Sequence, residues 1–240
     1  KNLKILSKPI LFESHQFSFI RKIFLKNIDY LILINSFQKK IYDHKNSIVL
    51  HDCIWASDIK NIKNNSYIKN TIFYSGTCNK IKGIERILHL ANYLKDFKFY
   101  IASLENYKNT NIPKELYREN IIWLGNLNRD QLNIYMKKME YFILPNDPFC
   151  KENLYTSPMK LFEYLAYKKG IIASQINTIK EILDESDYLT LPLNLADFDK
   201  ASDIIRESNT NKISKNYTKI VNNYTWEKRA EKLLEFIKFL

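Results

Sequence analysis

The stretch TIFYSGTCNKIKGIERILHLANYL, residues 71–94, joins two different periodicities around one glycine. TIFYS, residues 71–75, predicts a buried strand that ends at Gly76. Apolar residues then recur at positions 84, 87, 88, 91 and 94, which is the spacing of one helix face. A strand, a loop and a helix in this order are typical of one unit of a parallel α/β fold.

The same alternation continues along the chain after residue 94. Further strands are expected over residues 97–103, 120–124, 141–145, 171–174 and 188–192, and helices over 129–139 and 157–168. Strands that alternate with helices imply a parallel sheet covered on both faces, with right-handed crossovers. The predicted fold class is therefore α/β, a doubly wound, Rossmann-like parallel sheet with a partial second α/β domain.

The segments on either side of this sheet are organised differently. Residues 1–56 predict part of an N-terminal α/β domain, with strands to about residue 13, over 30–35 and over 47–52, and a helix near 17–26. The polar stretch 57–70 is interpreted as a linker and 71–224 as the main domain. Residues 225–240 predict a helix with Thr225 as its N-cap. Because the chain starts with Lys1 almost inside a strand-like stretch, we expect it to be a fragment of a longer protein.

Composition narrows the class of protein. The chain is 45% hydrophobic and 14% aromatic, which is enough for a packed core and argues against disorder. Three scattered cysteines without disulfide or metal spacing indicate a reducing compartment. No signal peptide is visible and no apolar run reaches transmembrane length, so a cytoplasmic location is expected.

The net charge of +11 is compatible with three anionic partners: nucleic acid, a membrane surface or a small anionic substrate. The lysines are scattered over predicted helix faces, and no basic run is interleaved with aromatic residues. Nucleic acid is therefore the least favoured of the three, and no nucleic-acid partner is predicted. Peripheral binding to an anionic membrane face remains open.

Two loops carry residues that suit an anionic ligand. Lys82 and Gly83 lie in the loop between the strand 71–75 and its helix, at the edge of the sheet where open α/β folds bind ligands. The spacing fits neither a Walker loop nor GxGxxG, and taken alone it favours a solvated lysine in a turn over a ligand contact. In the second loop Ser157 can cap a helix whose first residue is Pro158, and the start of that helix attracts anions.

Glu163 lies more than a turn inside this otherwise apolar helix. A charge there is costly unless it is paired or hydrogen-bonded. Two ribose hydroxyls would satisfy the carboxylate, and an ion pair with a neighbouring lysine would satisfy it equally well. Both interpretations stay open at this point.

Histidine and carboxylate patterns give little further signal. His15 follows a predicted strand and could face a cleft, although a lone histidine is more often structural. His51 and Asp52 are adjacent in a strand and therefore point to opposite sides. No metal-ligand spacing and no paired DxD aspartates occur, so no metal and no cofactor are predicted. A lysine and a helix dipole would then have to neutralise a bound diphosphate.

Together these segments resemble retaining glycosyltransferases of the GT-B type, family four, over residues 70–240, with a weaker continuation back to residue 10. The resemblance rests on YSGTCNKIKGIERIL (74–88), NIIWLGNLNRDQLNIYMKKMEYFILPN (120–146), SPMKLFEYLA (157–166) and YTWEKRAEKLL (224–234). SPMKLFEYLA is similar to the subgroup motif SPxKLFEYMA. The resemblance identifies 71–224 as the C-terminal, nucleotide-sugar-binding domain and 225–240 as the helix that crosses back to the N-terminal, acceptor-side domain.

The resemblance also implies roles for individual residues. Lys82 would contact the donor phosphates, and Glu163 would bind the ribose. His15, on the acceptor side, would be the catalytic residue and would contact the transferred sugar. The remaining substrate-binding residues border the base, the diphosphate or the sugar: Gly76, Thr77, Gly125, Asn126, Leu127, Ser157, Pro158, Met159 and Lys160. The implied partners are a nucleotide-diphospho-sugar donor and a glycan or lipid-linked acceptor. The implied role of the enzyme is in surface polysaccharide synthesis.

Three positions depart from the family pattern. Tyr155 stands where a glutamate eight residues before Glu163 is usual, Thr77 replaces an arginine, and DCIW (52–55) replaces Asn-Gly-Val-Asp. These departures keep a second interpretation open, that of a catalytically silent module that binds a nucleotide-sugar.

Overall fold

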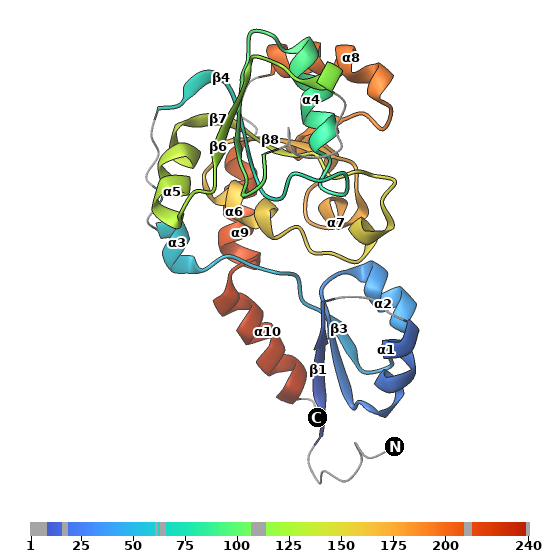
Figure 1. Ribbon diagram of the computed structural model, residues 1–240. Coiled ribbons are helices and arrows are strands. Elements are labelled where there is room, and N and C mark those ends of the chain that lie inside the picture. Colours follow the sequence, from blue (N-terminus) through green and yellow to red (C-terminus); the bar gives the residue numbers. More distant parts are fainter. Residues whose placement is uncertain are drawn as a thin grey trace.

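The computed structural model describes residues 9–15, 19–60, 62, 66–106, 114–208 and 213–238. Several predicted segments reach beyond these residues: the N-terminal domain into 1–8, the first helix into 17–18, the linker into 61 and 63–65, and the C-terminal helix into 239–240. The described parts of the chain contain two parallel sheets, one of three strands and one of six, with helices packed around them (Figure 1).

The larger sheet has the strand order β6-β5-β4-β7-β8-β9, and every pair is parallel. β4 lies in the middle, and the chain builds outward first on one side of it and then, from β7, on the other. This order makes the point between β4 and β7 the topological switch point of a doubly wound sheet. The predicted fold class is confirmed. The strands are β4 (Ile68–Ser75), β5 (Lys98–Ala102), β6 (Ile121–Gly125), β7 (Met139–Leu144), β8 (Gly170–Ser174) and β9 (Leu189–Leu191).

Helices cover both faces of this sheet (Figure 1). On one face α4 (Ile84–Tyr93) and α8 (Phe198–Glu207) pack on buried residues such as Ile72 and Phe99. On the other face lie α5 (Arg129–Lys138), α6 (Met159–Ala166), the short α7 (Asn177–Lys180) and α9 (Ile213–Asn223). The buried residues divide into two clusters, one on each face, as expected for strands that are buried on both sides.

The smaller sheet, of order β1-β2-β3, lies within residues 1–56. It consists of β1 (Leu11–Ser14), β2 (Tyr30–Leu33) and β3 (Ser47–Val49), with α1 (Phe19–Phe24) and α2 (Ser36–Tyr42). This sheet with its helices is called the small domain below, and the part built on the six-stranded sheet is called the large domain. α3 (Ala56–Lys60) overlaps the start of the predicted linker, and β4 begins at Ile68 rather than at 71. The polar composition of 57–70 concealed both, because the exposed start of β4 has no apolar alternation.

α10 (Trp226–Lys238) runs back from the large domain to the small sheet (Figure 1). The Thr225 hydroxyl accepts a hydrogen bond from the Lys228 amide at 3.2 Å, which confirms Thr225 as the N-cap. Arg229 is buried and donates to the Glu13 carboxylate at 2.5 Å, and to the carbonyls of His51 at 3.0 Å and Leu50 at 3.3 Å. One side chain thus joins α10 to the carboxyl ends of β1 and β3.

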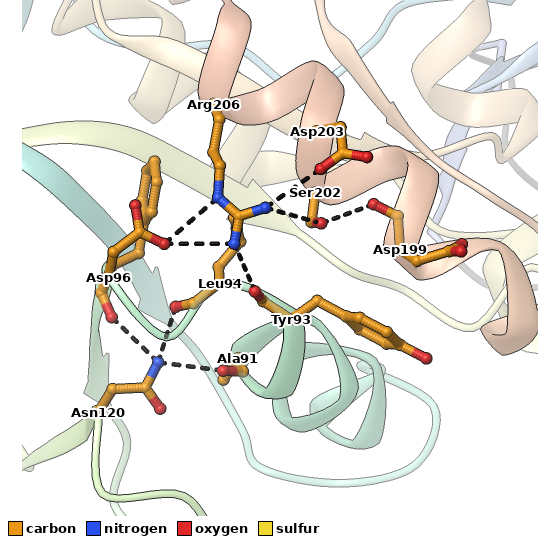
Figure 2. A network of polar contacts seen from close by, with 10 residues as sticks. Ala91, Tyr93, Leu94, Asp96, Asn120, Asp199, Ser202, Asp203 and Arg206 are labelled. Atoms are coloured by element: carbon orange, nitrogen blue, oxygen red, sulfur yellow. Dashed lines mark hydrogen bonds and ion pairs between the residues drawn. The ribbon is translucent and has the colours of Figure 1, made fainter.

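A polar network lies near the amino ends of β5 and β6, where α4 ends (Figure 2). The Asn120 amide donates to the carbonyls of Ala91 at 3.1 Å, Leu94 at 2.9 Å and Phe97 at 3.0 Å. The last carbonyls of a helix have no partner within the helix itself. Arg206 reaches the Tyr93 carbonyl at 2.6 Å from α8, so the two helices on this face are tied at one point.

Replacing Asn120 with Ala should lower the free energy of unfolding by about 1–3 kcal/mol, because it removes the half-buried amide that donates to the carbonyls of Ala91, Leu94 and Phe97. Urea unfolding followed by circular dichroism measures the change. Asp203→Ala is the matched control, since it removes only an exposed ion pair with Arg206 in the same network and should cost less than about 0.5 kcal/mol. Equal losses in the two variants would show that Asn120 does not hold the end of α4.

Candidate active site at the carboxyl edge of the large sheet

The turn that contains Lys82 and Gly83 packs against the end of β7. Gly83 has φ +75°, and a β-carbon added to it would lie 1.9 Å from the carbonyl oxygen of Pro145. No side chain fits there, so glycine is required for the two loops to meet. The Asp147 amide donates to the Ile81 carbonyl at 3.2 Å, and the Asn153 side chain donates to the same carbonyl at 3.1 Å. The loops after β4 and β7 are therefore joined directly at the switch point.

Two adjoining clefts open at this edge. A first cleft of about 300 Å³ lies over the ends of β4, β5 and β6, and a second of about 210 Å³ lies between the β4 loop and the start of α6. The first is lined by Ser75, Gly76, Thr77, Ala102, Ser103, Leu104, Glu105, Asn126, Leu127, Leu132 and Lys160. The second is lined by Tyr74, Ser75, Gly76, Thr77, Lys82, Leu144, Asn146, Thr156, Ser157, Pro158, Met159, Lys160, Ile176 and Thr178.

Most of the predicted site residues line these clefts. Asn126 and Leu127 line the first cleft, and Lys82 the second. Ser157, Pro158 and Met159 also line the second, while Gly76, Thr77 and Lys160 line both. Gly125 ends β6 immediately before Asn126. The clefts thus share a wall, and Lys160 is the cation on it.

The start of α6 differs from the prediction. The helix begins at Met159, with Pro158 as its N-cap rather than its first residue, and no side chain caps it. The Ser157 hydroxyl instead accepts a hydrogen bond from the Asp52 amide at 3.4 Å. The Met159 amide donates to the Ser157 carbonyl at 3.0 Å, so this amide is already used within the loop. The helix is shorter because Pro158, with ψ 68°, is not helical.

Glu163 has two cationic partners. Its Oε1 accepts from the Arg129 guanidinium and its Oε2 accepts from Lys160 Nζ at 2.8 Å, while its side chain is only 11% exposed. The interpretation that Glu163 pairs with a neighbouring lysine is therefore confirmed. Glu163 itself lines neither cleft, but Lys160 connects it to both. Arg129 is a partner that sequence reasoning missed, since it lies 34 residues earlier on another helix.

His15 is at the surface of the small domain. Its side chain is 57% exposed, and its Nε2 lies 3.0 Å from the Glu13 carboxylate, which also binds Arg229. It is not among the residues that line the two clefts. The structure therefore does not bring His15 together with Lys82 and Lys160.

Two further residues shape the clefts without having been predicted. The Tyr164 hydroxyl, on the buried side of α6, accepts a hydrogen bond from the Ser75 amide at 2.9 Å and so ties this helix to the end of β4. Burial raises the pKa of Tyr164, which keeps that hydroxyl neutral. Thr178 lines the second cleft and is 1% exposed, with a buried hydroxyl that has no hydrogen-bond partner among the described residues. A tyrosine in an apolar helix and a lone threonine give no sequence signal for either role.

The small domain holds the loop before α6. Asn35 donates to the carbonyls of Leu154 at 3.3 Å and Thr156 at 3.4 Å, and Gln38 donates to the Tyr155 carbonyl at 2.9 Å. The ring of Tyr155, at the position of the expected glutamate, packs edge-on against Phe37 at 5.5 Å. Tyr155 therefore takes part in the contact between the two domains.

A second contact between the domains involves Glu181. Its carboxylate accepts from the Ser36 amide at 3.0 Å and from the Ser36 hydroxyl at 2.5 Å. His51 Nε2 lies 3.7 Å from the same carboxylate. Burial lowers the pKa of His51, so this ring is neutral at pH 7 and the pair is not an ion pair there.

Within the described ranges, no cluster of three histidine, cysteine, aspartate or glutamate side chains could hold a metal ion. In the same part of the chain, every helix is too short or too polar to cross a membrane.

The sequence matches one family model over residues 69–205, which is more than half of the chain and includes all the residues that line the two clefts. The family is described as glycosyl transferases group 1. The chain belongs to this family. No curated protein matches the sequence.

This group 1 glycosyltransferase chain also shares its GT-B fold with solved glycosyltransferases. TarM superimposes with a TM-score of 0.72 at 16% identity, covering 92% of this chain and 46% of TarM. HepE from Anabaena, in complex with UDP and glucose, gives 0.73 at 12% identity, covering 97% of this chain and 72% of HepE. A glycosyltransferase from Rickettsia africae gives 0.74 at 17% identity, covering 98% and 71%. The chain thus spans less than half of TarM and about seven-tenths of the other two.

Gly83→Ala should destabilise the protein more than Gly125→Ala does, by about 1–3 kcal/mol. Both glycines have a positive φ, and both substitutions therefore share the cost of left-handed backbone. Only at Gly83 would the new methyl group meet a backbone atom, since the nearest atoms at Gly125 are 3.7 Å away. Urea unfolding of the two variants measures the difference. Equal losses would mean that the contact with Pro145 does not constrain the turn.

Proposed function

We propose that this chain is the donor-binding part of a retaining, metal-independent glycosyltransferase that uses a nucleotide-diphospho-sugar. The observation that carries the proposal is the pair of clefts that meet at Lys160 on the carboxyl edge of the large sheet, where doubly wound sheets bind nucleotides. The first cleft would take the nucleoside and the second the diphosphate and sugar. HepE, which has been solved in complex with UDP and glucose, supports this class of donor.

In the proposed reaction the bond between the anomeric carbon and the diphosphate breaks, and an acceptor hydroxyl oxygen bonds to that carbon. The hydroxyl proton is released and the nucleoside diphosphate leaves. Lys82 and Lys160 would stabilise the negative charge that develops on the departing diphosphate, as preorganised cations do. No step assigned to this chain requires a metal or a cofactor. Retention follows from the family-four resemblance.

The acceptor would be a glycan or a lipid-linked sugar, in surface polysaccharide synthesis. A mutant of S. aureus TarM has been solved in complex with fondaparinux, α-GlcNAc-glycerol and UDP, which supports a glycan-type acceptor for this fold. His15 remains proposed on the acceptor side; it would have to approach the second cleft when donor and acceptor are bound.

A catalytically silent nucleotide-sugar module is the second candidate. The packing of Tyr155 against Phe37 favours it, because the residue in place of the family's glutamate serves a domain contact. Sugar transfer or sugar release from labelled UDP- and GDP-sugars by the full-length protein would support the enzyme. Binding without any release would support the silent module.

Lys82→Ala should weaken binding of UDP or GDP by about ten- to a hundredfold, the loss expected for one charge-assisted hydrogen bond. Binding of the nucleoside without phosphates should be nearly unchanged. Isothermal titration calorimetry on both ligands measures the effect. Lys80→Ala, in the same loop but outside the two clefts, is the matched control and should bind like the wild type. Equal losses for nucleotide and nucleoside would count against a phosphate contact.

We also propose that the protein is cytoplasmic and docks loosely on an anionic membrane face, because its net charge is +11. Each basic residue near such a surface contributes roughly 1 kcal/mol. Flotation with vesicles of pure phosphatidylcholine and of phosphatidylcholine with phosphatidylserine tests this. Binding should be confined to the anionic vesicles and should fall as salt is raised. Equal binding to both kinds of vesicle would refute the electrostatic attraction.

A further inference from the structure

The geometry points to Arg129 as a positioning residue of the donor site, which holds the Glu163 carboxylate for the ribose of the nucleotide. This inference rests on the proposed function and adds to it a residue that neither the sequence motifs nor the family match assigns.

Arg129 connects three segments of the chain. One nitrogen of its guanidinium contacts Glu163 on α6, and another lies 3.4 Å from Asp58 on α3. Arg129 is itself the first residue of α5, where Asn128 and Gln131 form a reciprocal capping box. The backbone that carries the guanidinium is therefore held in place by its own helix start.

The same segment forms a wall of the first cleft. Asn126 and Leu127 line that cleft, and only Asn128 separates Leu127 from Arg129. The cleft wall and the partner of Glu163 thus belong to one continuous segment of chain. A shift of this loop would change both the nucleoside cleft and the orientation of the carboxylate.

The charge balance around Glu163 explains why a second cation is needed. Lys160 contacts Oε2 but also lines both clefts, so a bound diphosphate would compete for its ammonium group. Arg129 contacts the other oxygen and lines neither cleft. It can therefore keep the buried carboxylate paired when Lys160 turns to the phosphates. A buried carboxylate without a partner would be costly.

The two ion pairs do not exhaust the carboxylate. Two oxygens offer about four lone-pair sites, and the two cations occupy one site each, so hydroxyl donors can still be accepted. With Arg129 fixing one oxygen, the remaining acceptors have a defined direction. Ion pairing and ribose binding can then use different lone pairs of the same carboxylate.

The test is the affinity for UDP and GDP, and for their 2′-deoxyribose forms, in the wild type, Arg129→Gln, Arg129→Lys and Glu163→Gln. Arg129→Gln should weaken binding of the ribose nucleotide by about tenfold. Binding of the deoxyribose nucleotide should change little. Arg129→Lys, which keeps the charge, should recover part of the loss. Lys138→Gln, which removes an exposed charge from the same helix, is the matched control and should resemble the wild type on both ligands.

The outcomes separate this inference from the proposed function. Equal losses for ribose and deoxyribose forms in Arg129→Gln, with a ribose-selective loss in Glu163→Gln, would overturn the role of Arg129 and leave the donor site intact. No binding of any nucleoside diphosphate by the wild type would overturn both. If Arg129→Gln does not fold by circular dichroism, Arg129→Lys carries the same comparison, because a misplaced ammonium should still reduce the preference for ribose.

Discussion

The close contact between Gly83 and the Pro145 carbonyl is the constraint on which the candidate site depends. In a doubly wound sheet the loops after the two central strands diverge, and a crevice opens between them. Here those loops meet through backbone atoms, which only glycine permits. The turn that carries Lys82 is therefore held beside the loop that leads to α6. The second cleft is built on the two loops that this contact holds together, and the first adjoins it along the β4 loop.

Charge at the site is arranged around the buried Glu163 carboxylate. A carboxylate with 11% exposure requires partners, and two cations from different helices supply them. One of these cations lies in the clefts, and the other lies outside them. Among the described residues, the second cleft is thus lined by two cations, Lys82 and Lys160, and by no acidic side chain, whereas the first is lined by Lys160 and Glu105. The same arrangement would give a nucleotide separate contacts for its phosphates and its ribose.

The small domain takes part in the site through the loop at 154–157. Asn35 and Gln38 hold the carbonyls of that loop, and Arg229 holds α10 against the carboxyl ends of β1 and β3. A three-stranded sheet with few buried residues has little core of its own. Its position therefore depends on these polar contacts with the large domain and with the returning helix. A movement of the small domain would therefore displace Ser157 and Pro158, which line the second cleft.

The sequence by itself determined the six strands of the doubly wound sheet, the helices α4, α5 and α6 between them, the Thr225 cap and the two loops that line the clefts. These features depend on local periodicity and on residues with special backbone behaviour, which can be read over short windows. It did not predict α3, over 56–60, or the start of β4, because polar segments carry no periodic signal. Only the tertiary structure decided that Glu163 pairs with Arg129 and that Tyr155 packs on Phe37. It also decided that Ser157 does not cap α6 and that His15 is not among the residues that line the two clefts. Each of these features depends on residues that are distant in the chain or on a single backbone angle. The partners of a buried charge are the polar groups that the fold places within hydrogen-bond distance, and these cannot be deduced from neighbouring residues.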